Sequence, residues 1–103
     1  MNEKFYEIVL ASAICRIELR QPHGSGAVQA SVYLLHAGGL RPVLNAAGRA
    51  PIFMYRDEHT ALTVATDFLA DRFGAPTQLP VPCDPIKPRH GLRPVTWSER
   101  VDS

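Results

Sequence analysis

The sequence has little of what would assign it to a specialised class of protein. Two cysteines in 103 residues are too few for a disulfide-rich scaffold. The formal net charge is only +1, so no overall electrostatic attraction draws the chain toward nucleic acid, membrane surfaces or acidic substrates. Hydrophobic residues make up 46% of the chain and charged residues 20%, which is ordinary for a globular protein. These values indicate one small soluble domain.

The sequence also lacks a long hydrophobic run. The most apolar stretch near the N-terminus covers residues 8–15, whereas a membrane-spanning helix needs about 20 apolar residues. Glu3 and Glu7 flank Lys4, and a secretory signal would instead carry a positive leader. We therefore expect a cytoplasmic protein with reduced cysteines and no membrane partner.

Motifs that carry chemistry are missing as well. The glycines of residues 24–26 lack the lysine of a phosphate loop and the third glycine of a dinucleotide loop. Cys83, Asp84 and His90 offer three types of metal ligand, but no CxxC or HxxxH pair accompanies them. Cys15 has the position of a small buried residue. We expect no catalytic residue, no cofactor and no metal ion, and hence no enzyme.

Hydrophobic alternation is the clearest strand signal. Residues 13–19 are apolar at odd positions, whereas the even positions include Arg16, Glu18 and Arg20. Residues 21–26 contain several turn formers, and a second alternating run follows at residues 28–34. Two amphipathic strands around such a loop predict an antiparallel hairpin with one face buried and one in water.

The flanking segments predict further strands. Residues 40–46 form a weaker strand that contains Pro42, and residues 52–55 form a short apolar one. Residues 4–12 fit either an N-terminal helix or the first part of one long bent strand that continues through residues 13–19. Their aromatic and β-branched residues favour the strand.

The segment of residues 57–73 predicts an amphipathic helix. Asp57 is a suitable N-cap, and Gly74 is suited to the left-handed position after the last turn. Phe68 lies in the apolar arc and is expected to be nearly fully buried against the sheet. The arc consists of Ala61, Leu62, Ala65, Phe68, Leu69 and Phe73.

Six prolines lie from residue 76 onward, and this density predicts no regular strand or helix there. Interspersed apolar residues indicate an extended strap. We therefore predict an α+β domain of residues 1–75, with residues 76–103 as a Pro-rich strap of the same domain. In this domain a β-meander of three or four antiparallel strands carries one amphipathic helix on one face.

The absence of catalytic signals favours a non-enzymatic protein-interaction module, of the accessory or inhibitor type. Four apolar residues at even positions near the N-terminus continue a face that is otherwise polar, and such a patch is typical of an interface. We expect them to form a two-fold homodimer interface, and strand pairing between the two copies is one way to build it. They are Tyr6, Ile8, Leu10 and Ile14.

The strap carries the one stretch biased toward positive charge. An extended basic segment with an aromatic residue suits a protein partner, because arginine and tryptophan are enriched at binding hot spots. The alternative is single-stranded nucleic-acid binding through residues 87–97, by phosphate contacts and base stacking. The predicted partner-binding residues are Lys87, Arg89, His90, Arg93 and Trp97.

Overall fold

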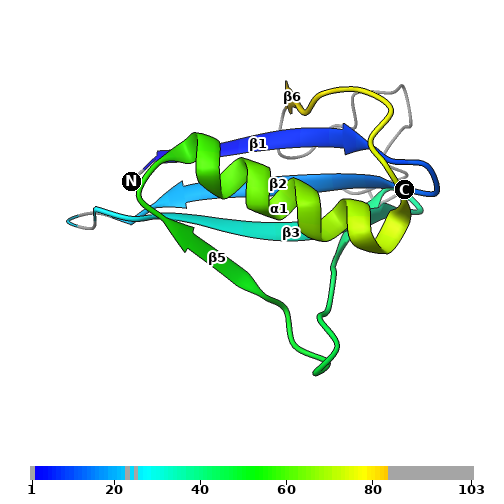
Figure 1. Ribbon diagram of the computed structural model, residues 1–103, viewed down its shortest axis with the longest axis horizontal. Coiled ribbons are helices and arrows are strands. Elements are labelled where there is room, and N and C mark those ends of the chain that lie inside the picture. The colour runs from blue at the N-terminus through cyan, green and yellow to red at the C-terminus, as the bar shows by residue number, and fades with distance from the viewer. Residues whose placement is uncertain (1, 23, 25, 84–103) are drawn as a thin grey trace.

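A computed structural model describes residues 2–22, 24 and 26–83 (Figure 1). Within these residues the fold is α+β, with one helix and one antiparallel sheet, as predicted. The sheet has six strands, not three or four, so it is larger than the alternation indicated. The elements in chain order are β1 (Asn2–Val9), β2 (Ile14–Gln21), β3 (Val28–His36), β4 (Gly39–Pro42), β5 (Ile52–Tyr55), α1 (Glu58–Phe73) and β6 (Val81–Cys83).

The sheet is built around the β1–β2–β3 meander. The strand order is β4-β3-β2-β1-β6, and β5 pairs with β3 beside this path. β4 and β5 share one side of β3. β4 pairs with residues 33–36 of β3, and β5 pairs with residues 28–31. The N-terminal half of β3 therefore has β5 as its outer neighbour.

The N-terminal segment is not one long bent strand, so that prediction is wrong. The chain reverses at Ala11 and Ser12, where the Leu10 amide donates to the Ala13 carbonyl over 2.8 Å. Ser12 is the only turn-favouring residue in it, and one serine within an apolar stretch was too weak a signal to predict a reversal. Because the chain reverses, even residues of β1 share a face with odd residues of β2, and Ile8 lies opposite Cys15.

Helix α1 begins and ends as predicted. The Asp57 carboxylate accepts a hydrogen bond of 2.8 Å from the Thr60 amide, and Gly74 has a φ of 92°. The β1–β2 turn closes the other end of the helix. Both the amide and the hydroxyl of Ser12 donate to the Phe73 carbonyl over 2.9 Å, which satisfies an acceptor that a helix end leaves open.

Figure 1 shows α1 lying across one face of the sheet, and the buried apolar residues of the helix and of this face form the core. Helix residues at i, i+4 and i+8 make the closest approach: Ala61, Ala65 and Leu69 are each fully buried. Phe68 is only half-buried, so the expectation of near-complete burial is wrong. It lies to the side of that line, where its ring centre is 5.4 Å from that of Phe53 in β5.

The first part of the strap follows β1. The Thr77 amide donates to the Val9 carbonyl over 2.8 Å, and Leu10 and Pro76 form an isolated bridge. The expectation of no regular strand after residue 76 is wrong for β6, which pairs with β1. Pro82 is tolerated there because β6 ends the strand order of the described sheet, and a strand at such a position can lack a ladder donor.

Candidate interaction surface

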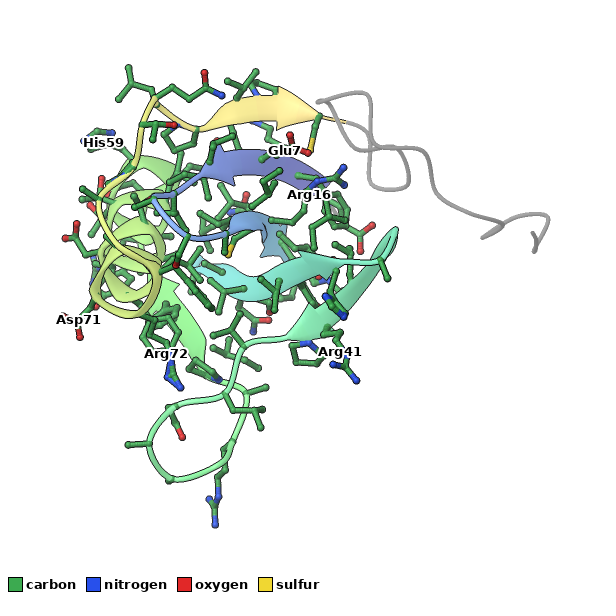
Figure 2. All side chains as sticks on the ribbon, turned by 90° about the vertical axis from the view of Figure 1, so that its right-hand side faces the viewer. Glu7, Arg16, Arg41, His59, Asp71 and Arg72 are labelled. Atoms are coloured by element: carbon green, nitrogen blue, oxygen red, sulfur yellow. The ribbon has the colours of Figure 1, made fainter. Side chains whose placement is uncertain are left out.

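The face of the sheet opposite α1 carries a buried ion pair. Arg16 Nε lies 3.1 Å from Glu7 Oε1, and the two side chains are 0% and 1% exposed. Figure 2 shows both on the side of the sheet away from α1. The alternation placed Arg16 on the correct face, but the expectation that it lies in water is wrong. Buried charges of this kind need each other, because either one alone has a large desolvation cost.

A second polar cluster lies on the same face, nearer the β2–β3 loop. Arg20 contacts Glu3 over 2.8 Å and Glu18 over 3.2 Å, and the Tyr33 hydroxyl donates to Glu18 over 3.2 Å. Burial, and then the nearby Glu18 carboxylate, raise the pKa of Tyr33. The acidic and basic side chains of this cluster pair with one another within the sheet, so we assign the cluster a structural role.

The four residues predicted for the homodimer interface do not form one patch. Ile8 and Leu10 belong to the core, at 0% and 3% exposure, and Tyr6 is half-buried on the same side of the sheet. Ile14 pairs with Val9 on the opposite face. The reversal at residues 11–12 causes this separation. The β1 strand is also paired on both sides, by β2 and β6, and offers no open edge for strand pairing over residues 5–7.

The predicted partner-binding residues of the strap lie outside the described residues. They are Lys87, Arg89, His90, Arg93 and Trp97. Among the described residues, no group of three or more His, Cys, Asp or Glu side chains could hold a metal ion. No helix in this part of the chain is long and apolar enough to cross a membrane.

An open groove of about 390 Å³ runs between α1 and the strap. Leu79 stands 83% exposed beside it and marks an apolar position that no other element covers in the described structure. The groove is lined by His59, Leu62, Thr63, Thr66, Asp67, Leu79 and Pro80. Most of its polar groups, His59 among them, lie on the solvent side of the helix (Figure 2), whereas the Thr66 hydroxyl oxygen is buried. These groups do not converge on an enclosed cavity.

The most exposed apolar strand is β5. Ile52 and Met54 are 59% and 56% exposed, and Tyr55 is 38% exposed. Within the described residues β5 pairs only with β3, so its other side is an open sheet edge. An open edge presents backbone donors and acceptors to any strand that approaches it.

The register shows which groups of β5 face outward. The Val43 amide donates to the Val32 carbonyl, so even residues of β3 direct their backbone groups toward β4 and β5. Ala30, opposite Phe53, therefore faces β5 through its backbone. The backbone N–H and C=O groups of Ile52 and Met54 then point away from β3. Pro51 shares the phase of Phe53, whose backbone groups face β3, so its missing N–H takes no donor from the outer edge.

The neighbouring edge strand β4 is protected, whereas β5 is not. By the same register Pro42 has its nitrogen in the outward phase and supplies no donor there. Arg41 adds an exposed charge to β4 (Figure 2). Proline and charge are the usual devices that prevent edge-to-edge association. β5 has neither within Ile52–Tyr55, so of these two neighbouring strands β5 is the one whose edge is unprotected.

The sequence contains a signal for this surface that alternation alone did not bring out. All four residues of 52–55 are apolar, so the two phases of the strand cannot be told apart. When all residues of such a strand are apolar and one phase faces the helix, the other phase places apolar side chains on the face without the helix. No protein-family model, no curated protein and no solved structure matches the chain.

Proposed function

We propose that this protein is a small non-enzymatic interaction module, of the accessory or inhibitor type, that binds an extended protein segment along the open edge of β5. The single observation that carries the proposal is the unprotected edge, with Ile52 and Met54 more than half exposed. Strand addition to a sheet edge gives affinity through main-chain hydrogen bonds and specificity through alternate side chains.

The two kinds of contact are available on the same two residues. The backbone groups of Ile52 and Met54 point outward, and their side chains lie on the face of the sheet opposite α1. A bound strand would place every second side chain beside them on that face. The partner is therefore an extended segment with apolar residues at alternate positions and no proline among its bonding residues.

The experiment is an amide chemical-shift titration with a synthetic peptide that alternates valine and threonine. We expect saturable shifts at Ile52 and Met54, and slower hydrogen exchange of their amides as the peptide binds. A peptide of the same composition with a central proline serves as the control and should bind at least about tenfold more weakly. Shifts confined to residues outside β5, or equal binding of the proline peptide, would contradict the proposal.

A further inference from the structure

We propose that the segment bound at this edge is β5 of a second copy of the chain, which gives a two-fold dimer with one continuous antiparallel sheet. The inference rests on the proposed function, because it names the partner for the same edge. Two-fold dimers use the same surface on both copies, so the surface must complement itself. The backbone and the side chains of β5 meet this requirement, and so do the charges of the residues that flank the strand.

The backbone complements itself in one register. A two-fold axis through Phe53 places Ile52 of one copy opposite Met54 of the second copy. Both residues direct their N–H and C=O groups outward in each copy, so each opposed pair exchanges both hydrogen bonds. This register uses every outward group of β5. Pro51 does not interfere, because its missing donor belongs to the phase that faces β3.

The side chains complement themselves in the same register. Ile52 and Met54 share the face opposite α1, and the two-fold axis sets each against the other across the new pair. Side chains 59% and 56% exposed in one copy would lose much of their contact with water. Phe53 lies at the axis on the other face, where it already packs against Phe68 and needs no rearrangement.

The charges beyond the two ends of β5 agree with antiparallel pairing. Exposed Arg49 precedes the strand and exposed Asp57 follows it, so antiparallel pairing brings the Arg49 end of one copy toward the Asp57 end of the second copy. The loop of residues 43–51, which carries Arg49, projects beyond the sheet next to β5 in Figure 1. Opposite charges near both ends favour antiparallel pairing of the two β5 strands, and the outward backbone groups of Ile52 and Met54 set the register.

The first experiment is sedimentation velocity over a range of protein concentrations. We expect a concentration-dependent dimer for the wild type, and dimerisation at least about tenfold weaker for Met54→Pro. This substitution removes an outward donor and no bond to β3. Leu79→Lys is the matched control, because it replaces an exposed apolar residue away from β5, and its dimer should be unchanged. A wild type that stays monomeric up to about 1 mM, or an equally tight Met54→Pro dimer, would overturn the inference.

Disulfide trapping tests the register and does not depend on how well Met54→Pro folds. Ile52→Cys and Met54→Cys are made separately in a Cys83→Ser chain. The two variants should cross-link efficiently when mixed, because residues 52 and 54 face each other within disulfide reach. Each variant alone should cross-link several-fold less. Equal cross-linking of the separate and mixed samples would contradict the register.

The outcomes separate this inference from the proposed function. A monomeric protein whose Ile52 and Met54 amides still respond to the valine–threonine peptide would overturn the dimer and leave strand binding in place. A monomeric protein whose β5 does not respond to the peptide would overturn both. A dimer that the peptide dissociates at high concentration would support both, because one edge cannot hold two strands.

Discussion

The two faces of the sheet bury different kinds of side chains. Under α1, Cys15, Ile17 and Leu19 of β2 lie in an apolar core and are at most 2% exposed. On the other face, Arg16 of the same strand is equally buried but lies against Glu7. Neighbouring residues of one strand thus reach the same exposure, one by packing and one by pairing of charges.

The comparison shows that burial on the two faces should respond differently to substitution. A buried apolar side chain contributes by filling space, so its loss leaves a cavity that no second change repairs. A buried ion pair contributes little beyond the cost of desolvating its two charges, so the loss of one partner is severe and the loss of both is mild. The faces should therefore differ in how a double substitution behaves.

The largest expected effect compares the two cysteines, one on each face. Burial raises the pKa of Cys15 from 9.0 to about 12, which lowers its thiolate population near pH 8 by about a thousandfold. Cys83 lies opposite Phe5 on the other face and is only half-buried. A thiol reagent at pH 8 should modify Cys83 quickly and Cys15 only after unfolding.

The control for this measurement is Cys83→Ser, which should remove the fast phase and leave the denatured protein with one reactive thiol. A fast phase that persists in this variant would show that Cys15 is accessible. The raised pKa of Cys15 also makes the stability of the fold depend on pH. The protonated thiol contributes its full share to the free energy of unfolding below pH 9, and this share is lost as the pH rises toward 12.

The next effect tests the ion pair itself. Glu7→Leu removes the Glu7 carboxylate from the buried Arg16 guanidinium, and we expect it to lower the free energy of unfolding by about 3–5 kcal/mol. The double variant Glu7→Leu/Arg16→Met should recover most of that loss. Urea denaturation measures both. A double variant as unstable as Glu7→Leu would mean that the charges contribute in some other way.

A comparison within α1 sharpens the description of the apolar face. Leu69→Ala should lower the free energy of unfolding by about 2–5 kcal/mol, because Leu69 is fully buried and its loss leaves a cavity. Phe68→Ala should cost distinctly less, since Phe68 is half-buried and borders β5. Thermal unfolding of the two variants side by side measures the difference, and equal losses would place Phe68 in the core after all.

The smallest expected effect is at the start of the helix, outside both faces. Hydrogen bonds from the backbone and hydroxyl of Thr60 lower the pKa of Asp57 below 3.8. Its contribution to stability is therefore present above pH 3.8 and is lost as the pH falls through the lowered value. Asp57→Ala should lower the melting temperature slightly at pH 7, and the difference from wild type should shrink in acid. A difference that does not change with pH would exclude the carboxylate as its source.

Local patterns in the sequence were sufficient for the elements that depend on local physics. The alternation around Ile17 predicted β2 and its two faces, and Asp57 and Gly74 predicted the ends of α1. The turn at Ala11 and Ser12 was not predicted, because Ser12 is its only turn-favouring residue and its geometry depends on contacts with the end of the helix. Missing that turn assigned Ile8 to the wrong face.

The candidate site depended on topology, which local patterns do not contain. Period-two alternation tells on which face Arg16 lies, but not whether that position is covered. The four apolar residues of β5 predicted a strand, but its place at an open edge follows from β4 and β5 sharing one side of β3. Strand phase then determines that Pro42 protects one edge while Pro51 leaves the other open.

The contact between Ser12 and Phe73 has a consequence for the order of folding. It joins residues 61 positions apart in the chain, so closing it has a large entropic cost that earlier local contacts do not share. Because contacts of large sequence separation slow folding, we expect this one to form after the local contacts of the sheet and helix. Ser12→Ala should therefore speed unfolding while leaving the refolding rate nearly unchanged. The contact between the β1–β2 turn and the end of α1 would then stabilise the folded domain mainly by slowing unfolding, and so prolong the lifetime of the folded state.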